Sequence, residues 1–240
     1  MDRSKFYASL RQRNSGVFGT SLSQRKVEGT DAILDAAAGL SVPHAAHVLA
    51  EAYHETGGGM YPVKETVFAH SKDKNPTDAQ VIARLDAAFA KGQLTWVSSP
   101  YWRGGMFGRG QIQITHSDNY LKLSKVVGVD LFASPDRALE LPISAKIAVQ
   151  GCARGLFTGK KLSDFDGIEY DHYNARAIVN GDKRANGAKI AGYGEAFEAA
   201  LKAGGWGTQP AFIDHTPPKT TQSPLAALFA AIAAIFGGKS

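Results

Sequence analysis

Residues 41–59 read SVPHAAHVLAEAYHETGGG, and this stretch decides what kind of fold the chain can form. Ser41 can cap a helix, and Pro43 fits the first helical turn. Leu49 and Tyr53 then fall on one face, with alanines around them at helical spacing. Three consecutive glycines stop the pattern. The stretch therefore predicts an apolar helix that ends in a glycine-rich turn.

The segments on either side repeat apolar residues at the same helical spacing. Helices are expected at 28–39, 77–91, 118–127, 141–156 and 185–203. Alternation with a period of two, which indicates a strand, is confined to short pieces such as 111–115. We therefore predict a mainly α domain with minor β content that spans residues 1–206.

Two glutamates frame the glycine-rich turn. Glu55 ends the apolar helix, and Glu65 follows ten residues later. Partial desolvation at such a helix end raises the pKa of a carboxyl and suits it to donate a proton near neutral pH. Glycoside hydrolysis needs a pair of this kind, an acid and a base that flank the scissile bond. Spacing alone leaves open the alternative that both glutamates are structural or solvated.

A second block, YWRGGMFGRGQIQIT at 101–115, is followed by Asn119 and Tyr120. It crowds glycine, arginine, amides and aromatic rings together. Aromatic faces stack on sugar rings, while amides and arginine hydrogen-bond to hydroxyl and N-acetyl groups. The alternative is a glycine-rich turn beside a buried strand, with Arg109 in an ion pair.

Together these segments resemble a known family. The HETGG segment, the second glutamate, the FGRGQIQIT block and the later Ile178-Val179-Asn180-Gly181 closely resemble glycoside hydrolase family 19. The likeness runs from about residue 29 to residue 203. That family contains chitinases and the related peptidoglycan-degrading lysozymes of phages and bacteria, and the chain resembles the endolysins of this second group most. The resemblance implies a lysozyme-like α-helical fold and an inverting mechanism.

The resemblance also implies roles for individual residues. Glu55 matches the general acid, which protonates the glycosidic oxygen, and Glu65 matches the general base, which activates a water on the opposite side. Inversion needs the two carboxyl groups roughly 6.5–9.5 Å apart, so that the water fits between them. Thr115 matches a residue that helps to hold this water. The residues expected to bind or border the substrate are His54, Tyr101, Trp102, Arg109, Gln113, Asn119, Asn180 and Lys189.

Three features depart from the family pattern. Three glycines follow Thr56 where two are usual, so the spacing from acid to base is one residue longer. Lys189 stands where the family often has an arginine, and a lysine lacks the planar bidentate fork. The several cysteines of plant chitinases are absent, because Cys152 is the single cysteine of the chain. This last departure favours the bacterial and phage branch.

The end of the chain differs in composition from the rest. Residues 207–223 combine proline, threonine, glutamine and serine and are expected to form a linker. Residues 224–240 are expected to form a short apolar helix. Its twelve most apolar residues would span only about 18 Å, too little for a hydrocarbon core of roughly 30 Å. This helix is expected to dock on the catalytic domain or on a second copy, with membrane-surface contact and disorder as alternatives.

Other kinds of site have weaker support. His47 and Glu51 are four residues apart, which can place two metal ligands on one helix face. A zincin site needs a second histidine four residues after the first, and four residues after His54 this chain has Gly58. We expect no metal and no cofactor. Cys152 falls in an apolar helix, as expected of a buried thiol. Basic residues are scattered and no nucleic-acid motif is present, so nucleic acid is not expected as a partner.

Charge and composition bear on the destination and the substrate. The net charge of +5 suits attraction to a polyanionic cell wall. The N-terminal segment lacks an apolar run of signal-peptide length. We therefore expect a monomer that is made in the host cytoplasm and reaches the wall after holin-type release, or alternatively is secreted by a non-classical route. The expected activity is endolysin-type cleavage of β-1,4 bonds in peptidoglycan glycan strands. Chitin hydrolysis is the main alternative, and non-catalytic glycan binding is a remote one.

Overall fold

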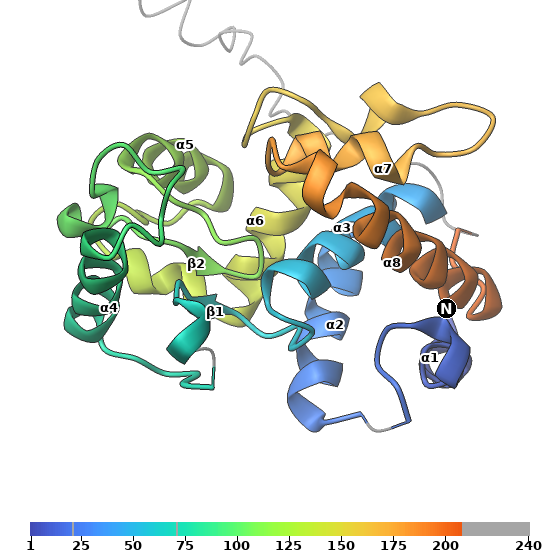
Figure 1. Ribbon diagram of the computed structural model, residues 1–240. Helices are drawn as coiled ribbons and strands as arrows, with labels where there is room; N and C mark the ends of the chain where they lie inside the picture. The colour runs from blue at the N-terminus through green and yellow to red at the C-terminus, as the bar shows by residue number, and fades with distance from the viewer. Residues whose placement is uncertain (21, 71, 208–240) are drawn as a thin grey trace, which may run out of the picture.

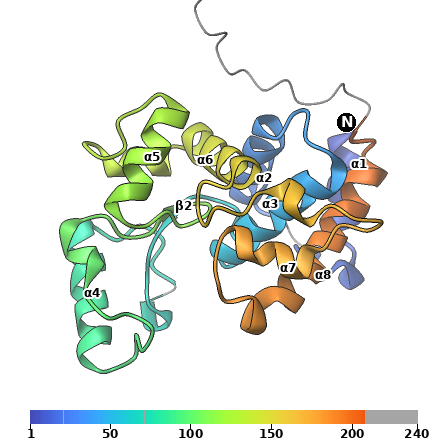
Figure 2. The same cartoon turned by 90° about the horizontal axis from the view of Figure 1, so that it is seen from above.

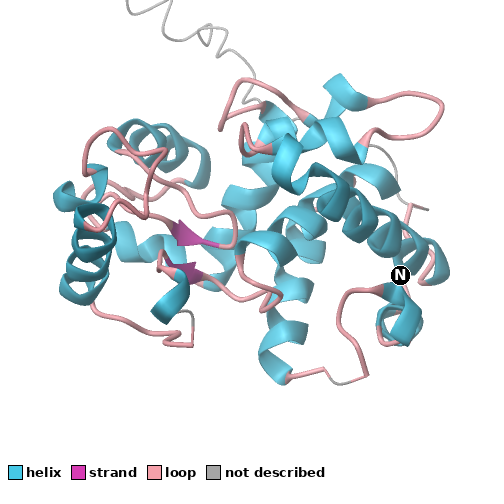
Figure 3. Ribbon diagram, in the orientation of Figure 1, coloured by secondary structure: helices cyan, strands magenta, loops and turns pink. Residues whose placement is uncertain are grey.

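Helices dominate the computed structural model, which describes residues 1–20, 22–70 and 72–207 (Figure 1, Figure 3). The helices of this described part are α1 (Arg3–Leu10), α2 (Gln24–Ala36), α3 (Val42–Glu55), α4 (Asp78–Ala90), α5 (Ser117–Val127), α6 (Leu141–Arg154), α7 (His172–Ala175) and α8 (Lys183–Ala203). Two short strands, β1 (Val63–Lys64) and β2 (Arg109–Gly110), pair antiparallel. The prediction of a mainly α fold with minor β content is confirmed.

Side-chain caps explain where several of these helices begin. The Ser41 hydroxyl accepts a hydrogen bond from the backbone of the first turn of α3, and Thr77 forms a capping box with Gln80 at the start of α4. The helices expected from periodicity are present, although α2 begins earlier than expected because Ser23 caps it. The sequence analysis missed α1, a short helix whose N-cap is Asp2.

The elements form two lobes that lie on either side of α6 (Figure 1, Figure 2). The large lobe contains α1, α2, α3, α7 and α8, and the small lobe contains the two strands, α4 and α5. The end of α3 and the segment after it lead from the large lobe into β1, so the chain crosses between the lobes directly after Glu55. This crossing brings the glycine-rich turn to the boundary between the lobes.

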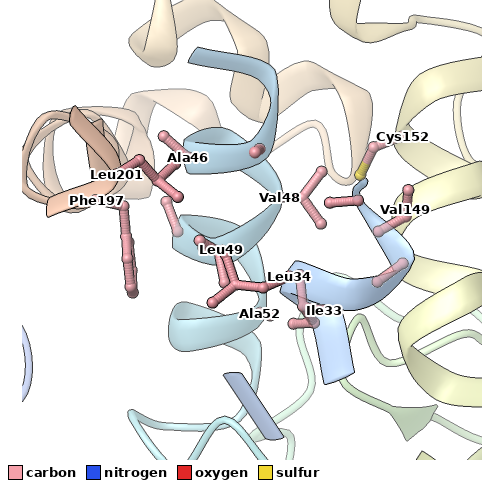
Figure 4. Close-up of a cluster of buried hydrophobic side chains, with 14 of the residues drawn as sticks. Ile33, Leu34, Ala46, Val48, Leu49, Ala52, Val149, Cys152, Phe197 and Leu201 are labelled. Carbon is pink, nitrogen blue, oxygen red and sulfur yellow. The ribbon is translucent and has the colours of Figure 1, made fainter. Parts of the chain in front are cut away.

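The core of the large lobe surrounds α3. Phe197 and Leu201 of α8 lie on one side of this helix, and Val149 and Cys152 of α6 lie on the other (Figure 4). Leu49 is fully buried within this cluster, and burying such a side chain contributes about 1.5–3 kcal/mol. Cys152 is fully buried, so the prediction of a buried cysteine is confirmed. This burial raises the pKa of its thiol.

The small lobe has its own apolar clusters, and α6 contributes to one of them. Ile147 of α6 packs with Ile114, Tyr120 and Leu123, although neighbouring residues of α6 belong to the core of the large lobe. A further cluster joins α4 to the segment before β2 through Trp102 and its apolar neighbours. The helix α6 is therefore shared between the two cores.

The strand expected at 111–115 is absent, and the structure has a tight turn there instead. The backbones of Arg109 and Ile114 exchange two hydrogen bonds of 3.2 and 3.0 Å, so residues 110–113 form the turn of a narrow hairpin. Gly110 and Gln113 have φ values of 94° and 53°, which reverse the chain. The apolar residues alternate here because Ile112 in the turn and Ile114, which pairs with Arg109, are both buried.

The described part of the chain ends beside the core of the large lobe. The indole Nε1 of Trp206 donates to the Leu40 carbonyl oxygen at 2.9 Å. The expected linker at 207–223, except for Gly207, and the expected apolar helix at 224–240 lie outside the described residues. Within the described part, no helix combines the length and apolar character needed to span a membrane.

Close packing at Gly29 of α2 gives a first testable prediction. A Cβ at this position would overlap the backbone carbonyl of Met60. The Gln111 amide donates to the carbonyl oxygens of both Gly29 and Met60, so this backbone is held in place. We expect Gly29→Ala to lower the free energy of unfolding by about 1–3 kcal/mol, as overpacking does. Urea denaturation measures the change. The control is Gly192→Ala in α8, where no atom lies within 4 Å and added helix propensity should stabilise by up to about 1 kcal/mol. Equal effects of both variants would contradict the prediction.

Candidate active site

A cleft of about 790 Å³ opens where the two lobes meet. The end of α3 and the segment around Asn180 form its wall on the large lobe. On the small lobe, its wall consists of β1, residues 96–101 and the hairpin. The expected site residues that line it are Glu55, Glu65, Tyr101, Gln113, Thr115 and Asn180. The structure therefore brings the two expected catalytic carboxyl groups to one cavity, from opposite lobes.

Glu55 is the last residue of α3, and its side chain is 17% exposed. Gly57 and Gly58 follow with φ values of 60° and 80°, which turn the backbone away directly after the carboxyl group. Burial raises the pKa of Glu55, and the nearby charge of Arg176 opposes this shift without cancelling it. A raised pKa favours the protonated form, which is the form that a general acid needs.

Arg176 supplies the positive charge beside the expected acid. Its Nη1 donates to Glu55 at 2.7 Å and also to Glu51, while Nε and Nη2 donate to Asp182 at 2.6 and 3.1 Å. The side chains of Arg176 and Glu51 are 2% and 0% exposed. The sequence analysis missed this cluster. A signal was present, because an arginine inside the apolar segment 175–179 indicates a buried ion pair.

Glu65 lies on the opposite wall, directly after β1. Its Oε1 accepts a 2.6 Å hydrogen bond from the Tyr101 hydroxyl, and its Oε2 accepts a 2.7 Å bond from the Gly108 backbone N–H. The Glu65 backbone N–H in turn donates to the Gly108 carbonyl at 2.7 Å. These contacts fix the carboxyl group in one orientation. A Cβ at Gly108 would crowd Glu65 and Gln113, so a glycine is needed for this approach.

The hairpin positions the other polar groups of this wall. The Gln113 amide donates to the carbonyl oxygens of Val63 and Gly110 at 2.8 and 2.9 Å, so it joins the turn to β1. Asn119 donates to the Thr115 carbonyl oxygen at 2.9 Å and is not among the cleft-lining residues. Gln113 and Thr115 therefore face the cleft, and Asn119 supports Thr115 from behind.

Asn180 lies on the large-lobe wall and is exposed. Its backbone N–H donates to the Arg176 carbonyl oxygen at 3.0 Å. One turn of chain therefore places the arginine beneath Glu55 and the asparagine at the cleft surface.

Two residues expected to border the substrate are buried, and this is a correction. Trp102 is fully buried, and its indole Nε1 donates to Asp86 at 2.8 Å. Arg109 is 1% exposed, and its guanidinium binds Asp78 and Asp136, each at 2.7 Å. Neither side chain lines the cleft, because each finds its polar partners inside the small lobe.

His54 and Lys189 also lie outside the described lining of the cleft. Burial, together with the charges of Arg176 and Lys189, lowers the pKa of His54 to about 4, so this imidazole is neutral near pH 7. Lys189 is an exposed residue of α8. Lys189, which stands where the family often has an arginine, does not line the cleft, and the cation beside Glu55 is Arg176.

Trp96 is a cleft residue that the sequence analysis missed. It lines the cavity and is 77% exposed, which is unusual for so large an apolar ring. It lies in the loop between Gly92 and Pro100, two residues before Ser98 and Ser99. A tryptophan in a short segment between a glycine and a proline, outside any helical pattern, was the available signal.

The buried residues His47 and Glu51 were considered above as a pair of metal ligands. Within residues 1–20, 22–70 and 72–207, no group of three or more histidine, cysteine or carboxylate side chains is arranged to hold a metal ion. His47 and Glu51 approach each other at 3.5 Å, and the further neighbours of this pair are His172 and Arg176.

Several solved structures are similar in fold to this chain. A mutant of chitinase C shares 18% identity with a TM-score of 0.45, covering 88% of this chain and 95% of its own. A structure described as a bacterial family 19 chitinase shares 19% identity with a TM-score of 0.44, covering 88% and 96%. Chitinase C from Streptomyces griseus shares 18% identity with a TM-score of 0.44, covering 86% and 77%. No family model and no curated protein matches the chain. Likeness at this level does not transfer an activity between proteins.

Glu51 gives a prediction about stability and pH. Burial raises its pKa from an ordinary 4.5 to about 8. Between these values the unfolded chain releases the proton and the folded chain keeps it, so the free energy of unfolding falls as pH rises. Glu51→Gln removes this penalty. We expect its Tm to exceed that of the wild type by at least about 3 °C at pH 8, equal to roughly 1 kcal/mol, and the gap to close near pH 4. Circular dichroism melts measure this, and a gap that is independent of pH would contradict it.

Proposed function

We propose that this protein is a glycosidase that cleaves β-1,4 bonds, with Glu55 as general acid and Glu65 as general base. The observation that carries the proposal is that both carboxyl groups line one cleft from opposite lobes. Their surroundings differ, because burial raises the pKa of Glu55 whereas Glu65 accepts two short hydrogen bonds, as an ionised carboxylate does. Unlike surroundings are what divide a carboxyl pair into an acid and a base.

The proposed reaction inverts the configuration at the anomeric carbon. Glu55 gives its proton to the glycosidic oxygen, which leaves with the electron pair of the broken C–O bond. Glu65 takes a proton from a water that attacks the anomeric carbon from the opposite face. Thr115 lies on the same wall as Glu65, where its hydroxyl can hold this water. Exchange with solvent returns the proton to Glu55 and removes the other from Glu65.

Peptidoglycan is the substrate that we propose first. The net charge of +5 concentrates the protein at a polyanionic wall. Lys74 is exposed and lines the cleft, where its ammonium group can pair with the carboxylates that muramic acid and its peptides carry. Chitin is the second candidate, because its glycan backbone has the same β-1,4-linked N-acetylated sugars but lacks these carboxylates. Non-catalytic glycan binding is a third possibility, which the presence of both carboxyl groups in the cleft disfavours.

The biological role that we propose is that of an endolysin. A monomer made in the host cytoplasm would reach the wall after holin-type release, with non-classical secretion as the other route. Contact of residues 224–240 with a membrane surface belongs to this proposal and concerns residues outside the described part of the chain.

Activity on two polymers tests the proposed chemistry. Glu55→Gln keeps the shape of the side chain but removes the proton donor, and Glu65→Gln removes the base. We expect each variant to lose about 10²–10⁴-fold in rate, the usual contribution of an acid or base. The measurements are muropeptide release from purified sacculi and soluble sugar release from colloidal chitin. The matched control is Glu169→Gln, an exposed glutamate outside the cleft, which should behave like the wild type.

Each result of this experiment has a distinct meaning. Sacculus cleavage with weak action on chitin supports the first substrate, and the reverse result favours chitin. Full activity of Glu55→Gln would contradict its role as the acid. Binding to either polymer without cleavage by the wild type would favour the non-catalytic alternative.

Trp96 gives a prediction about substrate affinity. Its exposed ring on the cleft wall can stack on a sugar face, and such aromatic contacts contribute about 0.5–1.5 kcal/mol beyond the area that they bury. We expect Trp96→Ala to raise KM by roughly 3- to 10-fold with little change in kcat, and Trp96→Phe to recover most of the loss. Steady-state kinetics on soluble glycan fragments measure both constants. A fall in kcat at constant KM would show that the ring acts in another way.

A further inference from the structure

A row of buried polar side chains runs through the large lobe, from α8 to the cation beside the proposed acid. Glu198 of α8 contacts His172 of α7 (Oε1 to Nε2, 3.1 Å). His172 contacts His47 of α3 (Nδ1 to Nδ1, 3.2 Å), and the two rings are stacked. His47 then faces Glu51, one turn further along α3 (Nε2 to Oε1, 3.5 Å). The other oxygen of Glu51 accepts a hydrogen bond from Arg176.

The contacts in this row determine where its protons lie. Glu198 also accepts a 2.6 Å hydrogen bond from the Lys202 ammonium group, as an ionised carboxylate does. His172 therefore donates to Glu198 through Nε2, which leaves its Nδ1 free to accept from Nδ1 of His47. In this tautomer of His47 the Nε2 atom carries no hydrogen, and that atom faces Glu51.

One further proton completes the row. His47 Nε2 and Glu51 Oε1 are both buried, and neither has a hydrogen-bond partner among the residues that the structure describes. Two bare acceptors that face each other in a buried site repel, whereas a hydrogen on Glu51 Oε1 makes the contact a donor–acceptor pair. The geometry therefore favours the neutral form of Glu51.

The electrostatics agree with this arrangement of protons. Burial raises the pKa of Glu51 to about 8 and lowers that of His47 to about 3. Burial also lowers the pKa of His172, and the bond to Glu198 only partly opposes it. For Glu198, burial acts upward, but the hydrogen bonds from Lys202 and His172 outweigh it, and the pKa is lowered. Near neutral pH these shifts give two neutral imidazoles, an ionised Glu198 and a protonated Glu51.

We propose that neutral Glu51 is a positioning residue for Glu55: it occupies one N–H of Arg176 and so prevents the guanidinium from binding the acid alone. This inference rests on the proposed role of Glu55 as general acid. Asp182 compensates the charge of Arg176 through hydrogen bonds from Nε and Nη2, and Nη1 donates to both glutamates, one N–H to each. Glu55 therefore lies beside a cation that is already compensated, which lets it keep its proton.

Other titratable groups near Glu51 come from several elements. Besides Arg176, they are His47 and Glu55 of α3, Cys152 of α6, Tyr170 of the segment before α7, and Asp182 at the start of α8. Arg176 is the single permanent cation in this set, which is why its N–H groups decide how the carboxyl groups divide the positive charge.

The pH dependence of activity tests the positioning role. Leucine at position 51 fits the apolar surroundings but accepts nothing from Arg176, so the guanidinium turns to Glu55 and favours its ionised form. We expect Glu51→Leu to move the alkaline limb of kcat by about 1 pH unit to lower pH at constant KM, a roughly tenfold loss above the limb. Glu51→Gln should return the limb to the wild-type position, because its amide accepts from Arg176 and donates to His47. A merely structural role would lower activity equally at every pH.

Infrared difference spectra test the proton on Glu51 without any need for activity. At pH 7 the Glu55→Gln variant, which lacks the carboxyl group of the proposed acid, should still show a protonated carboxyl band, as should the wild type and Glu169→Gln, and the additional Glu51→Gln substitution should remove it. A Glu55→Gln variant without this band would overturn the neutral form of Glu51. An unshifted limb in a folded Glu51→Leu variant, or the same shift in Glu51→Gln, would overturn the positioning role. A wild type that hydrolyses neither polymer, together with a Glu55→Gln variant that shows the band, would remove the proposed function and the positioning role together, and would leave the assignment of the proton standing.

Discussion

The hydrogen bonds of the Arg176 guanidinium are the interaction on which the acid side of the cleft depends. They join the end of α3 to the start of α8, two elements that lie more than a hundred residues apart in the sequence. Removing one partner of a buried ion pair costs about 3–5 kcal/mol, because the remaining charge stays desolvated. Glu51, Glu55 and Asp182 can share the space behind the cleft because this cation lies between them. The contacts of Arg176 therefore position Glu55, the proposed acid, and also connect α3 to the start of α8.

A second buried arginine organises the base side in a different way. Arg109 binds Asp78 and Asp136 within the small lobe, and Lys64 of β1 binds the same two carboxylates at 2.6 and 3.0 Å. These charges hold the hairpin against β1 but do not contact Glu65, whose donors are the neutral Tyr101 hydroxyl and a backbone N–H. Glu55, the proposed acid, thus lies beside a cation, and Glu65, the proposed base, lies beside neutral dipoles.

Local patterns in the sequence predicted the helices, because a helix depends on near neighbours, whereas the roles expected of the two glutamates came from the resemblance to a family. Caps and apolar spacing define α3 to within a residue or so, and the glycines after Glu55 mark the helix end as a place of close approach. Arg176 was missed because Glu51 and Glu55, the two partners that connect it to the cleft, are remote in sequence. Trp102 was misplaced for the same kind of reason, since its indole is satisfied by Asp86, a residue that the fold brings from α4. Long-range polar pairing is what periodicity does not reveal.

The helix α6 connects the two lobes, because its side chains belong to both of their apolar cores. One of its faces belongs to the core around α3 and another packs against the hairpin and α5, so the lobes cannot separate without pulling side chains of α6 out of one core. Both cores therefore oppose a change in the distance between the two walls of the cleft, because such a change would expose apolar side chains of α6. If the proposed function holds, this sharing of α6 limits the width of glycan strand that can reach Glu55 and Glu65 together.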